Sequence, residues 1–429
     1  MNISSIQKFF SVKFISDSII AIGAHIFVGI SGLIINSLIG IYYSAEGLGI
    51  FSQGFSIYLL LSLLANCGIM ISAQKHASQY SSDDETLAEI FSNTLAATAM
   101  VSLCIALCTY YLFSLNPGIL NSDDVLKFVL LICITIPFFA LNKTMNNFLV
   151  GLRIMNVYSG IRMFRWTLII IGIFLLSLND ETLFTIPFIF LYTELLLFFV
   201  LIIYCKDYWS RIKISQIRTH ISFGIKNILA VFLGESIYHM PILMIGYVNG
   251  NESAGYFAYV LAFSRSILMI PGAIQKNFTP IFTKHWYNNE HEEIASKIKK
   301  IFDISLKSII PVYILLYFFF LIYTSLLMPK EYLDFHLWLL VLLLGMSTIY
   351  LYGPFSTLLI MTDNLNLNLL RTLIFVLTTF ILILFFVNNF GNVGAAYGIS
   401  ISMIINLFFL NYFYKRYIGI KLFDITILN

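Results

Sequence analysis

The sequence predicts an all-α integral membrane protein with about twelve transmembrane helices in two six-helix lobes. Three observations predict this fold class: the composition, the spacing of the apolar stretches and a correspondence between the two halves. Of the 429 residues, 59% are hydrophobic and only 11% are charged, against roughly 25% charged residues in a soluble domain. A water-soluble fold could not bury so much apolar surface, and a net charge of +3 is too small to indicate nucleic-acid binding.

About twelve apolar stretches are long enough to cross a bilayer, which takes about 20 residues as a helix. The first six lie near residues 15–41, 48–72, 88–113, 125–148, 161–178 and 184–205. The second six lie near residues 222–248, 254–279, 303–328, 334–361, 369–389 and 394–414. The segment between the sets is basic and carries Lys206, Arg211, Lys213 and Arg218. We therefore expect an N-terminal lobe at 1–205, a cytoplasmic linker at 206–221 and a C-terminal lobe at 222–429.

The distribution of charge predicts which side of the membrane each loop faces. Lys and Arg accumulate in short cytoplasmic loops. With the N-terminus inside, the inner loops carry Lys75, Arg153 and the basic linker, whereas the outer loops are mostly acidic and include Asp123 and Asp180. Both termini are therefore predicted to be cytoplasmic, because an even number of spans returns the chain to the side on which it began.

The two halves of the chain correspond at one short segment. Residues 46–51 (EGLGIF) and 252–257 (ESAGYF) share Glu, Gly and Phe at the same three of their six positions. Each segment follows the first span of its half. This placement favours an internal duplication, and repeated halves around a central site are typical of transporters.

Three segments rich in glycine and aromatic residues, 43–51, 246–258 and 391–398, carry a resemblance to a known family. The chain resembles the polysaccharide flippase branch of the MATE-like transporter superfamily, the Wzx-type O-antigen exporters, over essentially its whole length in helix number. The resemblance implies a MATE-like, multi-pass protein of the bacterial inner membrane. It also implies that an undecaprenyl-diphosphate-linked oligosaccharide, such as the O-antigen unit of lipopolysaccharide, moves from the cytoplasmic to the periplasmic leaflet by alternating access.

The resemblance also implies what accompanies such a protein. A flippase of this kind is coupled to H⁺ or Na⁺, is not an enzyme, needs no cofactor, and works beside polysaccharide polymerase and chain-length machinery. Such families usually carry an Asp near the middle of the seventh span, and the acid in that neighbourhood here is Glu235. A metal site is not indicated, because His285 and His291 lack the i, i+4 spacing of a helical metal pair.

Arg265 is the candidate substrate-binding residue that lies deepest in a predicted span. It lies about 11 residues into the eighth span, roughly 16 Å from its start. A charge at that depth costs at least ~2.5 kcal/mol without a partner or a water-filled cavity. One interpretation is a cation that contacts the diphosphate of the substrate. The alternative is a structural ion pair with Glu235, and the two could alternate during transport.

Three further polar residues lie inside predicted spans and are candidates for ion coupling. Glu235 and His239 are four residues apart, on one face of the seventh helix. A carboxylate beside a histidine can change its protonation near neutral pH, but a hydrogen-bonded helix contact explains the pair equally well. Glu194 lies in the sixth span with no partner nearby in sequence, and a structural hydrogen bond is its plainer interpretation.

His25 and Lys143 complete the candidate substrate-binding residues. His25 lies within the first span, where it could line the substrate path. Lys143 gives the inner end of the fourth helix a polar face together with neighbouring asparagines, and Arg162 and Arg165 begin the fifth helix. Anchoring at the inner surface is the plainer interpretation of these three cations.

Two other classes of function remain open from the residues. A membrane polymerase or ligase of the O-antigen type would have a large periplasmic loop with catalytic groups, whereas every predicted outer loop here is short. A drug or cation antiporter of the same superfamily would have a cavity with acids in excess, whereas Arg265 makes this one at least partly cationic. The sequence has no phosphate-binding glycine-rich loop, so ATP-driven transport is not indicated.

Overall fold

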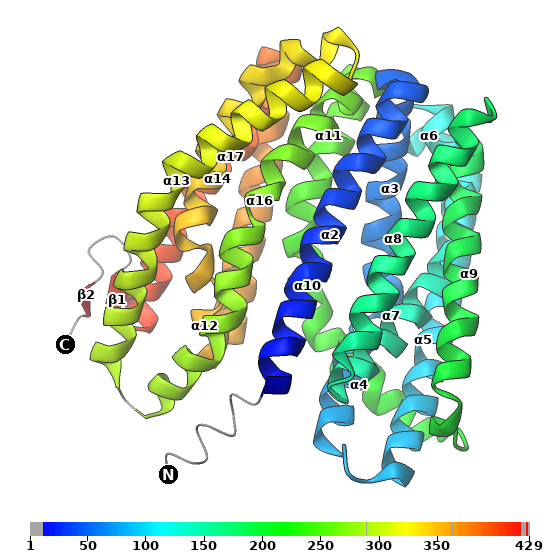
Figure 1. Ribbon diagram of the computed structural model, residues 1–429, viewed down its shortest axis with the longest axis vertical. Helices are drawn as coiled ribbons and strands as arrows, with labels where there is room; N and C mark the ends of the chain where they lie inside the picture. Colours follow the sequence, from blue (N-terminus) through cyan, green and yellow to red (C-terminus); the bar gives the residue numbers. More distant parts are fainter. Residues whose placement is uncertain (1–11, 289, 363, 422–425, 428–429) are drawn as a thin grey trace. The chain divides into compact units, whose positions relative to one another are not determined.

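The computed structural model describes residues 12–288, 290–362, 364–421 and 426–427, and nearly all of them are helical (Figure 1). Helices are expected here because a backbone inside lipid must satisfy its own hydrogen bonds. The first half of the chain forms α2 (Val12–Tyr42), α3 (Ser44–Asn66), α4 (Ile69–Gln79), α5 (Asp84–Leu115), α6 (Asp123–Ile132), α7 (Ile136–Gly151), α8 (Met155–Leu178) and α9 (Ile186–Tyr204). Short 3-10 turns lie at η1 (Pro117–Ile119), η2 (Cys133–Thr135), η3 (Leu183–Thr185) and η4 (Lys206–Tyr208).

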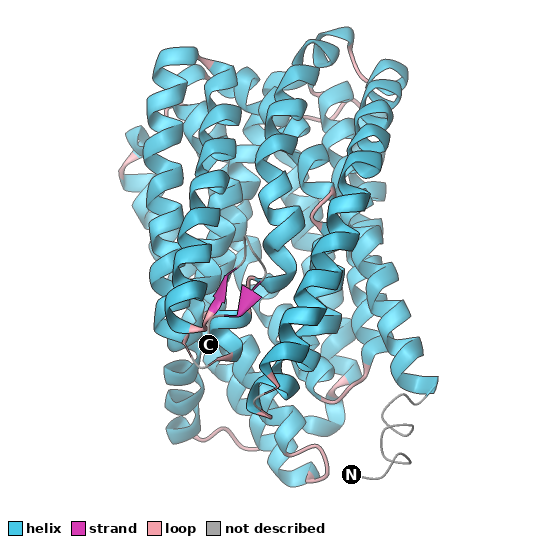
Figure 2. Cartoon of the chain, turned by 90° about the vertical axis from the view of Figure 1, so that its left-hand side faces the viewer, coloured by secondary structure: helices cyan, strands magenta, loops and turns pink. Residues whose placement is uncertain are grey.

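The second half is built in the same way. It forms α10 (Ile214–Asn249), α11 (Asn251–Ser266), α12 (Met269–Tyr287), α13 (His291–Leu327), α14 (His336–Tyr352), α15 (Leu358–Met361), α16 (Leu365–Phe390) and α17 (Asn392–Tyr417). The 3-10 turns η5 (Lys330–Phe335) and η6 (Gly353–Phe355) flank α14. Near its end the chain forms a small antiparallel pair, β1 (Ile420–Lys421) and β2 (Thr426–Ile427), drawn in magenta in Figure 2.

The number of membrane-crossing helices agrees with the expected twelve. In the described residues, 11 helices are long and apolar enough to cross a membrane. The count is twelve if α11 and the beginning of α12, which bend by 40° at a short break, form one span. The predicted eighth span at 254–279 is thus interrupted, and the predicted all-α membrane fold class is confirmed. The cytoplasmic position of both termini stays a prediction, and residues 1–11 lie outside the described part of the chain.

By their internal packing the residues form two compact units. The first unit comprises residues up to Leu38 together with Gly54–Phe232, and the second comprises Ile39–Gln53 together with residues from Leu233 onward. This division falls inside α10, whereas the sequence predicts lobes at 1–205 and 222–429 joined by a linker at 206–221. The lobe boundaries stay a prediction.

Polar contacts explain why residues 206–221 pack with the first unit. The backbone N–H of Lys213 donates to Asn93 Oδ1 on α5 at 2.6 Å, and Asn93 Nδ2 donates to Gln216 Oε1 at 2.6 Å. Gln216 Nε2 donates in turn to Glu89 Oε2 at 2.8 Å, and Glu89 also pairs with the Lys213 ammonium. The basic segment is thus held against α5 by both its backbone and its side chains.

In the second unit, α3 and α11 cross at the two glycines of the repeated segments. A Cβ on Gly49 would lie 1.7 Å from the backbone oxygen of Asn251 and 3.0 Å from Gly255 N, and a Cβ on Gly255 would lie 1.9 Å from Ala45 O and 3.0 Å from Gly49 N. Next to the crossing, Gln53 Nε2 donates to Asn251 Oδ1 at 2.9 Å. The corresponding glycines of the two halves therefore touch each other.

Gly49→Ala is expected to destabilise the protein because its methyl group would overlap a backbone carbonyl, which cannot move aside as a side chain can. Overpacking of this kind costs roughly 1–3 kcal/mol. The matched control is Gly234→Ala in α10, where a Cβ would meet nothing within 4 Å and helix propensity favours alanine by about 1 kcal/mol. Thermal unfolding of the two variants in the same detergent measures the difference. Equal midpoints for both would show that the crossing is not tightly packed.

Candidate functional site

The first unit contains a buried ion pair between α8 and α9. Arg165 Nε lies 2.8 Å from Glu194 Oε1, and Arg165 Nη2 donates to Glu194 Oε2 at 3.0 Å. Asn142 on α7 donates from Nδ2 to the same Oε2 at 2.7 Å and to the Glu194 backbone oxygen at 2.8 Å. Arg165 is 9% exposed and Glu194 1% exposed. The carboxylate has an opposite charge and an amide as partners, which favours a structural role for Glu194.

The interpretation of Arg165 as a surface anchor was wrong. Its side chain is buried because α8 packs against α9 and brings it to Glu194, which lies 29 residues away in sequence. A guanidinium is the cation best suited to such a place, since its planar fork can meet both carboxylate oxygens. The signal that could have found the pair is the presence of an Arg and a Glu in neighbouring spans.

Cations of α7 and α8 lie over one aromatic ring beside this pair. The Arg165 guanidinium is 5.1 Å, and the Lys143 ammonium 5.7 Å, from the centroid of Phe139. Phe139 packs edge to face against the buried Tyr58, with 5.5 Å between the ring centroids. Cation–π contacts of this kind stabilise a charge that has been removed from bulk water. Lys143, a predicted substrate-binding residue, therefore lies next to the buried ion pair.

His25 of α2 meets Arg162 of α8, one turn before Arg165. Arg162 Nη2 lies 3.5 Å from His25 Nδ1, Nη1 donates to Tyr158 Oη at 3.1 Å, and the guanidinium is 5.4 Å from the Tyr158 ring. We call His25, Lys143, Arg162 and Arg165 the basic cluster. Within the described residues, Arg162 is in none of the ion pairs, so its partners here are neutral or weakly basic.

The second unit contains Arg265, near the end of α11. Its guanidinium lies 4.3 Å from the centroid of the Tyr238 ring on α10. In the described part of the chain no carboxylate pairs with Arg265 within 4.0 Å, so the alternative ion pair with Glu235 is not formed in this conformation. The backbone oxygen of Arg265 accepts from Leu268 N–H at 3.0 Å, at the break between α11 and α12. Broken helices of this kind often border transport sites.

Glu235 and His239 differ in their surroundings although they are one helical turn apart. The side chain of Glu235 is exposed, whereas His239 is buried, with 6% of its surface exposed. Tyr238, which the sequence did not single out, lies between them in sequence and carries the contact to Arg265. The α10–α11 surface thus combines a buried imidazole, an exposed carboxylate and a guanidinium stacked on a phenol ring.

A group of histidine and lysine contacts lies outside the membrane-spanning segments, where α4 meets the beginning of α10. Ser72 Oγ is 2.8 Å from His220 Nδ1, and the rings of His76 and His220 are 5.3 Å apart and nearly perpendicular. The ammonium of Lys75 lies 4.7 Å from the Phe223 ring. Burial, and to a lesser extent the nearby His76, lower the pKa of His220 from its ordinary value of 6.5 to about 4.

Acid is expected to weaken this α4–α10 contact. An opened form takes up a proton on His220 below pH 6.5, whereas the packed form resists protonation down to about pH 4. The packing is therefore fully stable above pH 6.5 and is weakened progressively as the pH falls, by roughly 3 kcal/mol at most. Thermal unfolding between pH 7.5 and 5 measures the slope. His220→Gln should flatten it and the exposed control His291→Gln should not; an unchanged slope in His220→Gln would contradict the expectation.

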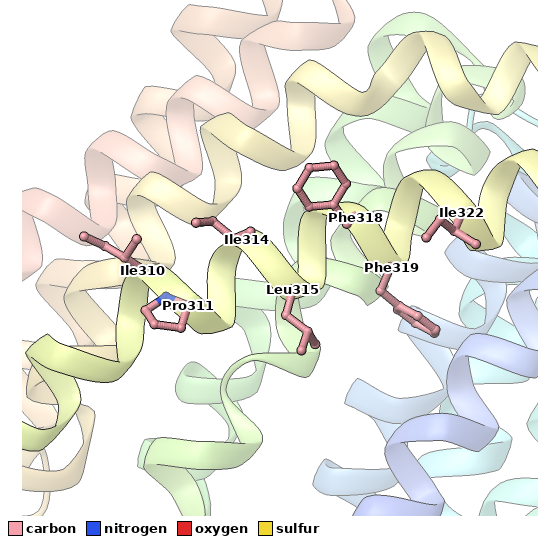
Figure 3. Close-up of a pocket in the computed structure, with 7 residues that line it drawn as sticks. All are labelled: Ile310, Pro311, Ile314, Leu315, Phe318, Phe319 and Ile322. Atoms are coloured by element: carbon pink, nitrogen blue, oxygen red, sulfur yellow. The ribbon is translucent and has the colours of Figure 1, made fainter.

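An apolar hollow lies along one face of α13 (Figure 3). Its lining residues all come from this helix and include Pro311, Leu315 and Phe318; Leu315 and Phe318 are among the most exposed apolar side chains of α13. A membrane-crossing helix presents such a face to lipid hydrocarbon. The hollow has no polar side chain that could bind a headgroup or an ion.

A family model described as polysaccharide biosynthesis protein matches residues 118–336, just over half of the chain. A comparison with curated proteins gives no significant match.

Solved structures with a similar fold are transporters and a flippase. An inward-facing multidrug resistance MATE family transporter of the MOP superfamily is 15% identical, covers 91% of this chain and 96% of its own, and has a TM-score of 0.65. The lipid II flippase MurJ, in an inward closed conformation, is 17% identical, covers 92% of this chain and 87% of its own, and has a TM-score of 0.66. The MATE multidrug transporter DinF-BH is 15% identical, covers 97% of each chain, and has a TM-score of 0.66. At these identities the likeness shows the fold alone, and the predicted MATE-like fold is confirmed.

Proposed function

The chain belongs to the family of polysaccharide biosynthesis proteins whose model it matches, and on that premise we propose that it is a flippase for a lipid-linked oligosaccharide. The substrate is an undecaprenyl-diphosphate-linked repeat unit, such as that of the O-antigen of lipopolysaccharide. The protein moves this lipid from the cytoplasmic to the periplasmic leaflet of a bacterial inner membrane by alternating access. Polysaccharide polymerase and chain-length machinery act on the product.

The observation that carries the proposal is the pairing of membrane-embedded arginines with neutral aromatic partners. Arg162 contacts Tyr158 and His25, and Arg265 contacts Tyr238. A cation in a membrane span is retained where an anion or water compensates its charge. The diphosphate of a lipid-linked sugar is such an anion, and a guanidinium fork matches its oxygens. In the first unit, His25 on α2 and Lys143 on α7 are likewise proposed as substrate-binding residues.

Two likenesses support the substrate class and the transport mode. The similar fold of a lipid II flippase supports a lipid-linked substrate, and that of MATE transporters supports alternating access. For coupling to H⁺ or Na⁺ we propose the exposed carboxylate of Glu235, with His239 as its buried neighbour. Glu194 is the weaker coupling candidate, because Arg165 and Asn142 already occupy its oxygens.

The competing functions fit these residues less well. A cation antiporter would present free carboxylates, whereas the buried acid of the first unit is bound to Arg165. A polymerase would need a catalytic loop outside the membrane. On the predicted outer side, α2 and α3, α10 and α11, and α16 and α17 are each joined by one residue: Tyr43, Gly250 and Gly391.

The test is transport by the purified protein. Proteoliposomes that contain the full chain and a labelled undecaprenyl-diphosphate oligosaccharide should expose the sugar to an added glycosidase faster than empty vesicles do. In the native cell, deletion should accumulate single repeat units on the cytoplasmic leaflet. Accumulation of single units on the periplasmic side would point to a polymerase, and transport of a cationic dye without transport of the lipid would point to an antiporter.

A further inference from the structure

We propose that the second unit binds a phosphate group of a lipid at Arg371, on α16. This site is separate from the residues assigned to transport above, and the inference does not rest on the proposed function. Arg371 Nη2 donates to Asn368 Oδ1 at 3.3 Å, and Nη1 donates to Asn406 Oδ1 on α17 at 3.4 Å. Both partners are neutral, and both hydrogen bonds are long.

The charge of Arg371 has no counter-charge among the described residues. In the described part of the chain no carboxylate lies within 4.0 Å of it. Its Nε is buried without a hydrogen-bond partner. A buried donor that belongs to a charged group and lacks an acceptor is strongly unfavourable in an apolar setting. An anion at this position would remove that penalty.

The two asparagines add further donors to the same place. Because a guanidinium only donates, the amide oxygens of Asn368 and Asn406 face it, and their amide nitrogens remain as donors. Neither nitrogen donates a hydrogen bond within the described residues, although Asn368 is 9% exposed. Arg371 Nε and the two amide nitrogens are therefore donors that an oxyanion near Arg371 could engage.

The depth of Arg371 favours a lipid phosphate as the source of the anion. Arg371 lies six residues after the first residue of α16, Leu365, or roughly 9 Å along the helix. That depth is near the boundary between the hydrocarbon core and the headgroup region. Two lipids bring phosphate there: a membrane phospholipid, and a polyprenyl diphosphate. Their shared chemistry is the phosphate group, and experiment can separate them.

The experiment measures lipid binding by the purified full chain in a neutral detergent. The probes are phosphatidylglycerol, farnesyl diphosphate and, as the phosphate-free control, diacylglycerol. Arg371→Gln should weaken binding of a phosphate-bearing probe by at least about tenfold and leave diacylglycerol unchanged. The matched control is Arg416→Gln, at the exposed end of α17, which should leave all three affinities within about twofold.

The outcomes distinguish the sources of the phosphate. Loss of phosphatidylglycerol binding identifies a phospholipid site, and loss confined to farnesyl diphosphate identifies a polyprenyl diphosphate site. Equal affinities in the wild-type and Arg371→Gln proteins, or an equal loss for diacylglycerol, would overturn the proposal. If Arg371→Gln does not fold, Arg371→Lys keeps the charge without the fork. It should then bind the phosphate probe more weakly than wild type, and unchanged binding would overturn the proposal.

Discussion

Arg265→Ala is expected to reduce transport of the lipid-linked sugar by at least about 100-fold, equal to about 2.7 kcal/mol in the barrier, with normal amounts of protein in the membrane. The reason is that Arg265 lies against the Tyr238 ring and has no carboxylate partner among the described residues, so we expect it to be available to a diphosphate. Arg265→Lys should retain part of the rate, because it keeps the charge but loses the planar fork. Initial rates in proteoliposomes of equal protein content measure both variants.

The alternative role of Arg265, neutralisation of Glu235, predicts a different result. If the two residues formed an ion pair in another state of the transport cycle, removing both charges would restore the transport that either single change destroys. Because Glu235 is exposed and does not pair with Arg265 in this conformation, Arg265→Ala with Glu235→Gln is expected to remain inactive. Recovery of transport in the double variant would refute a contact between Arg265 and the substrate.

Arg165→Met is expected to lower the free energy of unfolding by about 3–5 kcal/mol, because it leaves the carboxylate of Glu194 buried without its opposite charge. Glu194→Gln should cost less than Glu194→Ala, since the amide oxygen can still accept from Asn142. The double variant Arg165→Met with Glu194→Leu should regain much of the loss, because no charge remains buried. Denaturant unfolding in mixed micelles measures the series.

The control for this series is an exposed ion pair of the same chain. Lys297 Nζ lies 3.8 Å from Glu293 Oε2 on the surface of α13. Lys297→Met should change the unfolding free energy by less than about 1 kcal/mol. A cost for Arg165→Met as small as that of Lys297→Met would show that Glu194 is reached by water.

The spans could be predicted from the sequence because membrane helices are specified by local composition and length. The interruptions could not. The predicted second span ran to residue 72, but α3 ends at Asn66 because Cys67 and Gly68 adopt left-handed backbone angles, with φ of 49° and 70°. The eighth span bends between α11 and α12, where Pro271 lacks the N–H that would bond to the Ile267 carbonyl four residues earlier. Neither interruption shows in hydropathy, which records how apolar a segment is and not its backbone angles or hydrogen bonds.

The site could be predicted only in part for the same reason. The apolar stretches placed His25, Lys143, Glu194 and Arg265 inside predicted spans, and their roles as site residues stay predictions. Hydropathy could not identify their partners, because Arg165 and Glu194 meet through the packing of α8 on α9. Spacing also placed Glu235 and His239 on one helix face, yet one is exposed and the other is buried. A face defined by four-residue spacing is wide enough to cross the edge of a packed surface.

The glycine crossing of α3 and α11 has a mechanical consequence for Arg265. Helices normally interlock side-chain ridges into grooves, which resists rotation of one helix against the other, but at Gly49 and Gly255 bare backbones meet. At this crossing no side chains interlock, and the hydrogen bond from Gln53 to Asn251 restrains it on one side. Arg265 lies ten residues beyond Gly255 on the same helix, about 15 Å along its axis. A rotation of roughly 10° at the crossing would move Arg265 by about 3 Å, enough to separate the guanidinium from the Tyr238 ring.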